Sequence, residues 1–357
     1  MRRALTLAER GLGRTTPNPA VGALIVRDGQ VIAEGFHEKA GLDHAEIVAL
    51  KQVGGRAQGS VLYTTLEPCN HHGRTGPCTE AIIAAGIKTV VVGAGDPNPK
   101  VAGRGVARLR SAGVEVVEGV LEADCRRLNE AYNLAIVEGR PFVLLKAAMS
   151  LDGRIATKKG ESKYLTGEEA RGEVHRLRDR YDAILVGVGT VLADDPELTV
   201  RLAGSRNPLR VVLDSQLRTP LESRLVKTAR TVPTLLVTTH DASAARRRRL
   251  EKKGVAILNV KANRSGRVDL LRMLKALHAR ELNSLLVEGG SQVHGAFFDA
   301  GLVDKVAFFY APLLIGGEAA KGPIGGGGVA KLKKAPRLLD VRWRALGPDL
   351  LIEGYPR

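Results

Sequence analysis

Apolar and polar positions alternate with two different periods over the first 140 residues, which predicts strands and helices in turn. Two apolar stretches, 21–26 and 31–35, flank Asp28-Gly29, a dipeptide typical of a tight hairpin turn. Residues 44–53 instead place apolar side chains at helical spacing. The same patterns predict helices over 4–12, 78–85, 102–112 and 121–137 and strands over 60–65, 88–93 and 114–118. This alternation favours a three-layer α/β sandwich.

The apolar pattern is interrupted at Gly139-Arg140-Pro141, which predicts a boundary between domains 1–140 and 141–357. The second half again has an α/β rhythm. We expect strands over 142–148, 182–188, 210–214, 233–238, 255–260, 284–287, 305–315 and 349–354, and helices over 167–178, 267–280 and 291–300. The polar run Val191–Arg201 is expected to be a loop.

Length and composition exclude several classes of protein. The 357 residues suffice for two ordinary domains, and no apolar run approaches the ~20 residues that cross a bilayer. The first residues lack the apolar stretch of a signal peptide, and three cysteines are too few for a disulfide framework. We therefore expect a cytoplasmic protein without a membrane partner.

The net charge of +16 is unevenly distributed. Residues 1–140 hold 17 basic and 15 acidic side chains, a net of +2, which leaves +14 for residues 141–357. A basic half suggests an anionic partner such as nucleic acid, a membrane surface or a phosphorylated small molecule, although solubility explains it equally well. The run Arg246–Arg249 is expected to be a solvated helix face.

Four residues of the first half have the spacing of a catalytic zinc site. His44 and Glu46 begin a predicted helix, and Cys69 and Cys78 follow the next strand. One imidazole and two thiolates leave the fourth position of a tetrahedral zinc open for water, whose pKa the metal lowers toward ~7. Glu46 then has the place of the proton shuttle in the zinc deaminase pattern H-x-E…P-C.

Taken alone, Cys69 and Cys78 are better explained as buried apolar residues and His44 as a surface histidine; taken together with Glu46 and Pro68, they favour the zinc site. The eight residues between the cysteines depart from the usual two, so His71 and His72 remain rival ligands. The insert is expected to be a substrate loop in which Arg74 meets a phosphate.

The second half offers weaker signals of its own. Glu288-Gly289-Gly290-Ser291 joins a predicted strand to a helix, a turn that suits a dinucleotide pyrophosphate but also serves packing in many α/β proteins. Asp194-Asp195, with Arg178 and Arg201, suits a phosphosugar, although Asp-Asp-Pro is often only a capped turn.

Longer motifs carry a family resemblance. EPCNHHGRTGPC at 67–78, with TPNPAVGALIV and HAE before it and DPNPKVAGRG at 96–105, resembles the bacterial bifunctional pyrimidine deaminase/reductase of riboflavin biosynthesis. LKAAMSLDGRIA, VGTVLADDPELTVR, VVLDSQ and LLVEGGSQVHGAFF resemble the reductase domain of the same family. The match runs from Ala4 to about Gly316, whereas cytidine and tRNA adenosine deaminases share only the short pattern.

The resemblance implies a cytidine-deaminase-like sandwich followed by a dihydrofolate-reductase-like domain. The first would use one zinc per chain to deaminate 2,5-diamino-6-(5-phosphoribosylamino)pyrimidin-4(3H)-one. The second would use NADPH to reduce the ribosyl group of 5-amino-6-(5-phosphoribosylamino)uracil to ribityl. Phosphorylated pyrimidines are thus the expected partners, nucleic acid is not, and a homo-oligomer stays open.

The resemblance also assigns individual residues. It implies cofactor positions at Ala148, Tyr164, Thr190, Asp194, Ser215, Gly290, Ser291, Gln292, Val293, His294, Gly295 and Ala296. Asp194 would lie between cofactor and substrate, and Tyr164 stands where some members carry another aromatic residue. Substrate positions are implied at Asn18, His71 and Arg74 in the first half and at Ser162, Arg178, Leu198, Arg201 and Glu288 in the second.

Two alternatives remain at this point. One is a nucleic-acid base deaminase whose basic second half binds RNA, and the other is a non-enzymatic nucleic-acid-binding protein with a structural zinc. Aromatic residues make up only 4% of the chain, whereas single-strand binding generally uses stacking rings. Glu46 would also have no role beside a purely structural zinc.

Overall fold

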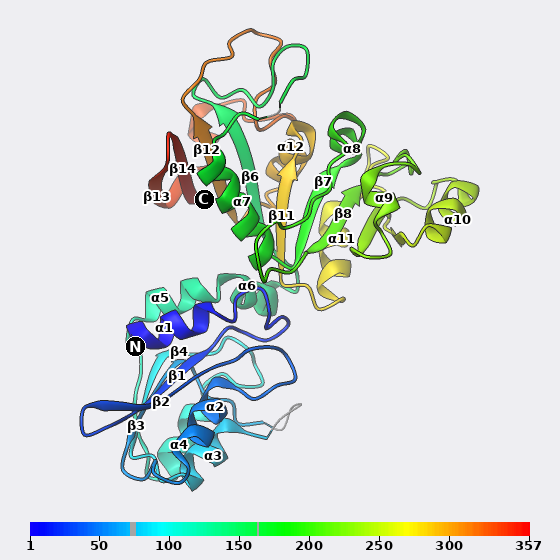
Figure 1. Ribbon diagram of the computed structural model, residues 1–357. Coiled ribbons are helices and arrows are strands. Elements are labelled where there is room, and N and C mark those ends of the chain that lie inside the picture. The colour runs from blue at the N-terminus through cyan, green and yellow to red at the C-terminus, as the bar shows by residue number, and fades with distance from the viewer. Residues whose placement is uncertain (72–75, 163) are drawn as a thin grey trace. The chain divides into compact units, whose positions relative to one another are not determined.

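The computed structural model describes residues 1–71, 76–162 and 164–357 (Figure 1). The chain forms two compact units, Met1–Arg140 and Pro141–Arg357. Each unit is built around its own sheet and has its own buried core.

A five-stranded sheet in the order β2-β1-β3-β4-β5 forms the centre of the first unit. The predicted hairpin is confirmed, because β1 and β2 pair antiparallel on either side of Asp28-Gly29. β1 also pairs antiparallel with β3, whereas β3, β4 and β5 run parallel. The strands are β1 (Gly22–Arg27), β2 (Gln30–Phe36), β3 (Val61–Leu66), β4 (Thr89–Ala94) and β5 (Glu115–Val117).

Helices cover both faces of this sheet, as the expected three-layer sandwich requires (Figure 1). One core cluster joins α2, α3 and α4 to inward-facing side chains of β1, β3 and β4, and a smaller one packs α1 on the opposite face. The helices are α1 (Arg2–Glu9), α2 (Ala45–Val53), α3 (Cys78–Ala84), α4 (Arg104–Ser111), α5 (Glu122–Leu128) and α6 (Glu130–Glu138).

The single helix predicted over 121–137 is wrong, because α5 and α6 are separated at Asn129. The backbone leaves the helical region there, with φ −105°. The buried Asn129 side chain accepts the Ala20 N–H at 2.8 Å and donates to the Ala20 carbonyl at 2.9 Å. These contacts come from a distant part of the chain, so the local pattern does not reveal the break.

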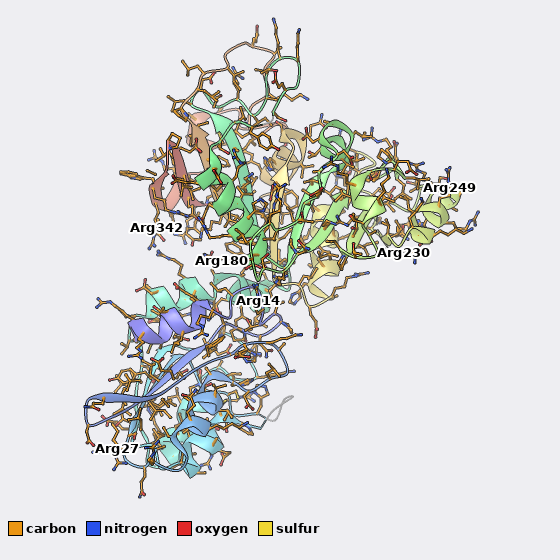
Figure 2. All side chains as sticks on the ribbon, viewed as in Figure 1. Arg14, Arg27, Arg180, Arg230, Arg249 and Arg342 are labelled. Carbon is orange, nitrogen blue, oxygen red and sulfur yellow. The ribbon has the colours of Figure 1, made fainter. Side chains whose placement is uncertain are left out.

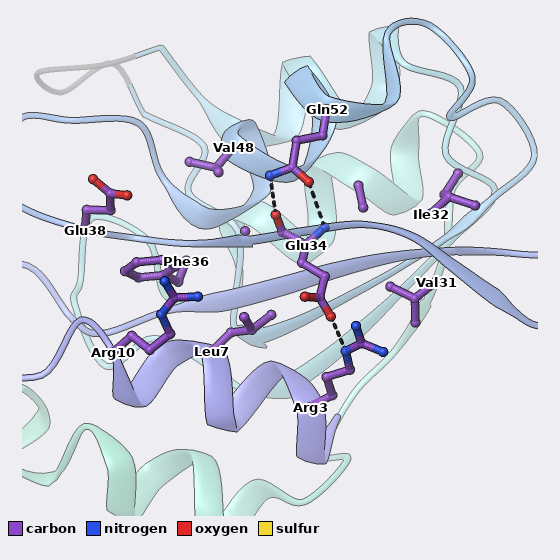
Figure 3. Close-up of a pocket in the computed structure, with 12 residues that line it drawn as sticks. Arg3, Leu7, Arg10, Val31, Ile32, Glu34, Phe36, Glu38, Val48 and Gln52 are labelled. Carbon is purple, nitrogen blue, oxygen red and sulfur yellow. Dashed lines mark hydrogen bonds and ion pairs between the residues drawn. The ribbon is translucent and has the colours of Figure 1, made fainter.

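Strand β2 forms one edge of the sheet, and a side chain covers part of that edge (Figure 3). Gln52 of α2 donates from Nε2 to the Glu34 carbonyl at 2.7 Å, and its Oε1 accepts the Glu34 N–H at 3.2 Å. The Gln52 amide thus takes the place of a peptide group of a neighbouring strand. A surface pocket lies alongside, where Arg10 stacks on the Phe36 ring and Arg3 pairs with Glu34.

The second unit contains a nine-stranded sheet in the order β10-β9-β8-β7-β11-β6-β12-β14-β13. The seven strands from β10 to β12 run parallel, and β14 and β13 complete the sheet antiparallel. The carboxyl ends of the parallel strands therefore share one edge. The strands are β6 (Phe142–Ser150), β7 (Ala183–Gly187), β8 (Leu209–Leu213), β9 (Thr234–Thr238), β10 (Ala256–Asn259), β11 (Ser284–Gly289), β12 (Lys305–Ala311), β13 (Leu338–Leu346) and β14 (Asp349–Pro356).

Successive strand residues bury their side chains on opposite faces of this sheet. One cluster packs the sheet against α7, α8, α9 and α10, and the other packs it against α11 and α12. The helices are α7 (Glu168–Arg180), α8 (Val188–Asp194), α9 (Arg224–Lys227), α10 (Ala244–Lys252), α11 (Leu270–His278), α12 (Ser291–Asp299) and a 3₁₀ turn at Leu332–Lys334. None of the helices in the described ranges is both long and apolar enough to cross a membrane.

Three sequence expectations for this unit need correction. The first residues of the loop predicted over Val191–Arg201 are helical, because α8 extends to Asp194 and packs Val188 and Val191 into the core. Strand β13 was not predicted, although Val341, Trp343 and Ala345 alternate with charged residues; all its side chains except Leu346 are exposed. The strand predicted over 305–315 ends at Ala311.

The run Arg246–Arg249 does lie on a helix, α10, but only part of it is a solvated face. Arg246 donates to the carbonyls of Leu217 and Thr219 at 2.9 and 2.7 Å, and Arg247 donates to Asn259 Oδ1 at 2.6 Å. Arg248 and Arg249 are exposed. Figure 2 shows Arg249 projecting from this region, and other arginines project from both units.

Candidate functional sites

Two of the predicted metal ligands, His44 and Cys69, line a cavity of about 340 Å³ in the first unit, and the third, Cys78, is buried next to them. His44 caps the start of α2, Cys69 follows β3, and Cys78 begins α3. The His44 Nδ1 atom lies 3.3 Å from Cys78 Sγ and 3.6 Å from Cys69 Sγ, and all three ligand atoms lie within 4.8 Å of one another.

These distances fit a tetrahedral zinc ion. Zinc bonds to nitrogen and sulfur at tetrahedral angles place an N and an S ligand about 3.6 Å apart. The Cys69 Sγ atom also accepts the Cys78 backbone N–H at 3.5 Å. The donor set of one imidazole and two thiols suits zinc and leaves a fourth position for a small ligand.

The hydrogen bond between the two thiols favours the thiolate of Cys69 and raises the pKa of Cys78. The hydrogen bond from the Cys78 thiol outweighs burial and lowers the pKa of Cys69 to about 4. Thiolate is the form that binds metals. Glu46 lies one helical position beyond Ala45 on α2 and is only 3% exposed. Burial raises the pKa of Glu46, although the His44 imidazole opposes this effect.

The three substrate positions implied for this half are placed differently. Asn18 and His71 both line the cavity. The Asn18 amide nitrogen lies 3.0 Å from His37 Nε2. His71 is not part of the group that could hold a metal. His72 and Arg74 lie outside the described residues.

Four further side chains line this cavity or hold its wall, and the sequence did not single them out as site residues. His37 orients Asn18, and Tyr132 donates to the buried Asp96 carboxylate at 3.0 Å. Glu67 accepts the backbone N–H groups that begin α4, at 3.0 to 3.2 Å, and thus supports the wall. Asp96 and Glu67 begin the motifs DPNPKVAGRG and EPCNHHGRTGPC, so the sequence pointed to both residues but not to their roles.

In the second unit, two of the implied substrate residues bind each other. Glu288 lies near the end of β11, and Arg178 of α7 contacts its two carboxylate oxygens at 2.7 and 2.9 Å. Lys146 of β6, not assigned from the sequence, approaches Glu288 to 3.7 Å. Burial alone would raise the pKa of Glu288, but these two cations outweigh it and lower the pKa to about 2.

The predicted strand–Gly-Gly–helix turn is confirmed, since β11 ends at Gly289 and α12 begins at Ser291. A Cβ atom on Gly290 would lie 3.5 Å from Thr190 Oγ1, which is ordinary contact. Packing within the chain therefore does not require a glycine at 290. At Gly295 packing does require one, because a Cβ there would lie 2.3 Å from the Gly325 carbonyl group.

The other residues of the implied cofactor segment form the first turns of α12: Ser291, Gln292, Val293, His294 and Ala296. His294 is buried and donates from Nδ1 to the Pro323 carbonyl at 2.9 Å. Burial lowers the pKa of His294 to about 4. The imidazole thus stays neutral and anchors the helix to the segment around Pro323.

The remaining implied cofactor residues lie on three elements or next to them. Ala148 is on β6, Asp194 is the last residue of α8, and Ser215 follows β8 and accepts the Val268 N–H at 3.2 Å. Tyr164 is 74% exposed, with the Arg171 guanidinium 5.2 Å from its ring centre.

Of the remaining implied substrate residues, Ser162 is half-buried and Leu198 has its side chain in the core. Leu198 has φ +53°, and only its backbone is left for a ligand. Arg201 is exposed and donates from Nε to His175 Nε2 at 3.2 Å. No sequence motif pointed to His175.

Two family models match the chain. Residues 1–94 match the cytidine and deoxycytidylate deaminase zinc-binding region, and residues 141–352 match the RibD C-terminal domain. The riboflavin biosynthesis protein RibD of Actinobacillus pleuropneumoniae is 47% identical over 99% of this chain and 93% of that protein. The Escherichia coli RibD is 40% identical over 99% of this chain and 97% of its own. The chain belongs to the RibD family.

Solved RibD structures have the same fold. The superposition with a deaminase/reductase from Thermotoga maritima covers all of this chain and 97% of the Thermotoga chain. The two sequences are 39% identical, and the TM-score is 0.87. Acinetobacter baumannii RibD gives the same values. The predicted α/β class, with a cytidine-deaminase-like half and a dihydrofolate-reductase-like half, is confirmed.

Membership of the RibD family also confirms the predicted type of enzyme. The chain is a bifunctional enzyme of riboflavin biosynthesis with a zinc-dependent deaminase half and an NADPH-dependent reductase half. Because the basic second half is a RibD C-terminal domain, the alternative of a base deaminase with an RNA-binding arm is not favoured.

Proposed function

We propose that residues 1–140 deaminate 2,5-diamino-6-(5-phosphoribosylamino)pyrimidin-4(3H)-one and that residues 141–357 reduce the product, 5-amino-6-(5-phosphoribosylamino)uracil. The first step replaces the 2-amino group by oxygen from water and releases ammonia. The second converts the ribosyl group to ribityl. The observation that carries this proposal is the His44–Cys69–Cys78 group with Glu46 beside it, in a chain whose other half is a RibD C-terminal domain.

In the deaminase half, His44, Cys69 and Cys78 would hold the zinc, which supplies a water of lowered pKa when bound. The Glu46 carboxylate would accept a proton from water and return it to the ring nitrogen and to the departing amine. Its burial in the cavity suits this role, because a carboxylate whose pKa is raised is a stronger base and so takes up a proton more readily. Asn18 and His71 line the cavity as substrate contacts, and Arg74 is assigned to the substrate phosphate.

In the reductase half, NADPH supplies the hydride when bound. The backbone N–H groups at the start of α12, where Gly290 and Thr190 lie close together, would bind its pyrophosphate. The other assigned cofactor contacts are Ala148, Tyr164, Asp194, Ser215 and the segment Ser291–Ala296.

The sugar phosphate is assigned to Ser162, Arg178, Leu198, Arg201 and Glu288. Arg178 and Glu288 hold each other rigidly, so Glu288 remains an ionised acceptor for sugar hydroxyls. The exposed Arg201 is the member of this set suited to a phosphate.

The +14 charge of residues 141–357 agrees with binding of a phosphorylated substrate and NADPH in that half. We assign the enzyme to the cytoplasm, with phosphorylated pyrimidines and not nucleic acid as its partners. A homo-oligomer is compatible with both sites.

Mass spectrometry of the products tests the proposal. The purified full-length chain is incubated with the diaminopyrimidine substrate, with and without NADPH. Without NADPH we expect the deaminated ribosyl compound alone, and with NADPH the ribityl compound. Unchanged substrate in both reactions of a zinc-loaded preparation would refute the assignment.

A further inference from the structure

The loop that contains Leu198 and Arg201 is attached to helix α7 by two side chains one turn apart. Arg178 donates from Nη1 to the Thr199 carbonyl at 2.9 Å, and His175 receives the Arg201 Nε–H at 3.2 Å. The position of the Arg201 guanidinium therefore depends on His175.

This contact defines the state of the imidazole. A guanidinium can only donate, so His175 Nε2 must accept, and the ring must be neutral with its proton on Nδ1. His175 is 9% exposed. Burial first, and then the Arg178 and Arg201 cations, lower its pKa, while Glu288 opposes them. The ring is thus neutral at neutral pH.

Arg178 and Arg201 differ in which of their guanidinium nitrogens remain available to a ligand. Arg178 has donated from all three of its nitrogens, to both Glu288 oxygens and to the Thr199 carbonyl. Arg201 uses only Nε, and within the described ranges no acidic side chain pairs with it. Its two terminal nitrogens form an exposed fork, the geometry that binds phosphate oxygens in pairs.

We propose that His175 is a positioning residue of the reductase half, which aims the Arg201 fork at the 5-phosphate of the substrate. This inference rests on the proposed function, because it requires a phosphorylated substrate. His175 touches neither substrate nor cofactor, and acts by holding Arg201. Protonation of His175 would remove the acceptor and place a second cation beside Arg201.

Steady-state reduction by the full-length enzyme, measured as NADPH oxidation with 5-amino-6-(5-phosphoribosylamino)uracil, tests the proposal. His175→Leu removes the acceptor, so we expect the KM for this substrate to rise about tenfold, with kcat and the KM for NADPH nearly unchanged. His175→Gln retains an acceptor that does not titrate and should restore most of the affinity. His240→Leu, which replaces an exposed histidine of the same unit, should leave all constants unchanged.

The pH dependence separates positioning from packing. In the unaltered chain the substrate KM should rise as the pH falls through the pKa of His175, below the ordinary histidine value. The His175→Gln profile should keep only the rise due to the substrate phosphate. In an Arg201→Ala background, His175→Leu should have no further effect on KM, because the group that it positions is gone.

Several outcomes would overturn the inference. They are an unchanged substrate KM in His175→Leu, a His175→Gln profile identical to that of the unaltered chain, or full additivity with Arg201→Ala. Loss of kcat and of NADPH affinity together, with a lowered melting temperature, would show a structural role and also overturn it. If the unaltered chain does not reduce the substrate, the proposed function itself fails.

Discussion

Replacing Gly290 by alanine tests whether cofactor binding or packing requires a glycine at the start of α12. The added Cβ would lie 3.5 Å from Thr190 Oγ1 and meet no other atom within 4 Å outside its chain neighbours. The φ of −78° is also open to alanine. We therefore expect Gly290→Ala to fold with an unchanged melting temperature.

The effect on cofactor binding should be large. If the NADPH pyrophosphate approaches the backbone at Gly290, the new methyl group occupies part of its place. A loss of about 1.4 kcal/mol or more of binding free energy raises the dissociation constant of NADPH tenfold or more. The deaminase half should keep its full activity.

Gly172→Ala is a matched control in the same unit, and Gly295→Ala, in the segment assigned to the cofactor, is a reference for the effect of packing on melting temperature alone. At Gly295 the Cβ would lie 2.3 Å from the Gly325 carbonyl group, and overpacking of this kind costs about 1–3 kcal/mol. The better helix propensity of alanine returns up to about 1 kcal/mol. The net loss should lower the melting temperature by about 2–8 °C for a unit of this size. Gly172 of α7 faces open space, so alanine there should stabilise by about 0.5–1 kcal/mol.

Thermal melting and titration with NADPH, followed by the quenching of protein fluorescence or by calorimetry, measure both effects for all three variants. A folded Gly290→Ala protein with unaltered NADPH affinity would refute the pyrophosphate assignment. A Gly290→Ala protein that melts as early as Gly295→Ala would show that packing, not the cofactor, requires the glycine.

Three further outcomes are expected from the site geometry. Metal analysis should find less than one zinc per chain in Cys78→Ala and a full zinc complement in His71→Ala. The opposite pattern would replace Cys78 by His71 in the ligand set. Glu46→Gln should keep zinc and lose deamination by about 10²–10⁴-fold, with NADPH oxidation on the deaminated substrate unchanged; a joint loss of both activities would contradict separate sites. A fragment of residues 141–357 should reduce the deaminated substrate, since these residues have their own sheet and core, and an insoluble fragment would show that the first unit is needed for folding.

Elements with a clear apolar period could be predicted from the sequence, and those that depend on distant contacts could not. The hairpin around Asp28-Gly29 has both a turn signal and two apolar strands. By contrast, Asn129 divides a helical pattern through bonds to Ala20. Strand β13 was missed for another reason. Val341, Trp343 and Ala345 alternate with charged residues, but these side chains are exposed, and the strand is held by its backbone pairing with β14.

The candidate sites show the same division. His44, Cys69 and Cys78 belong to short motifs, so their proximity could be predicted from the spacing of those motifs. His175 has no motif and becomes notable only because α7 places it against Arg201. The mutual pairing of Arg178 and Glu288, 110 residues apart, likewise depends on the packing of α7 against the sheet.

The Gln52–Glu34 contact has a consequence for the behaviour of the enzyme at high concentration. Exposed sheet edges recruit strands from other molecules and so promote self-association. Here an incoming strand would have to break the two Gln52–Glu34 hydrogen bonds before it could pair at Glu34. Each of these bonds is worth about 0.5–1.5 kcal/mol. A single amide side chain thus acts as a barrier to aggregation at the middle of β2, without adding length or charge to the strand.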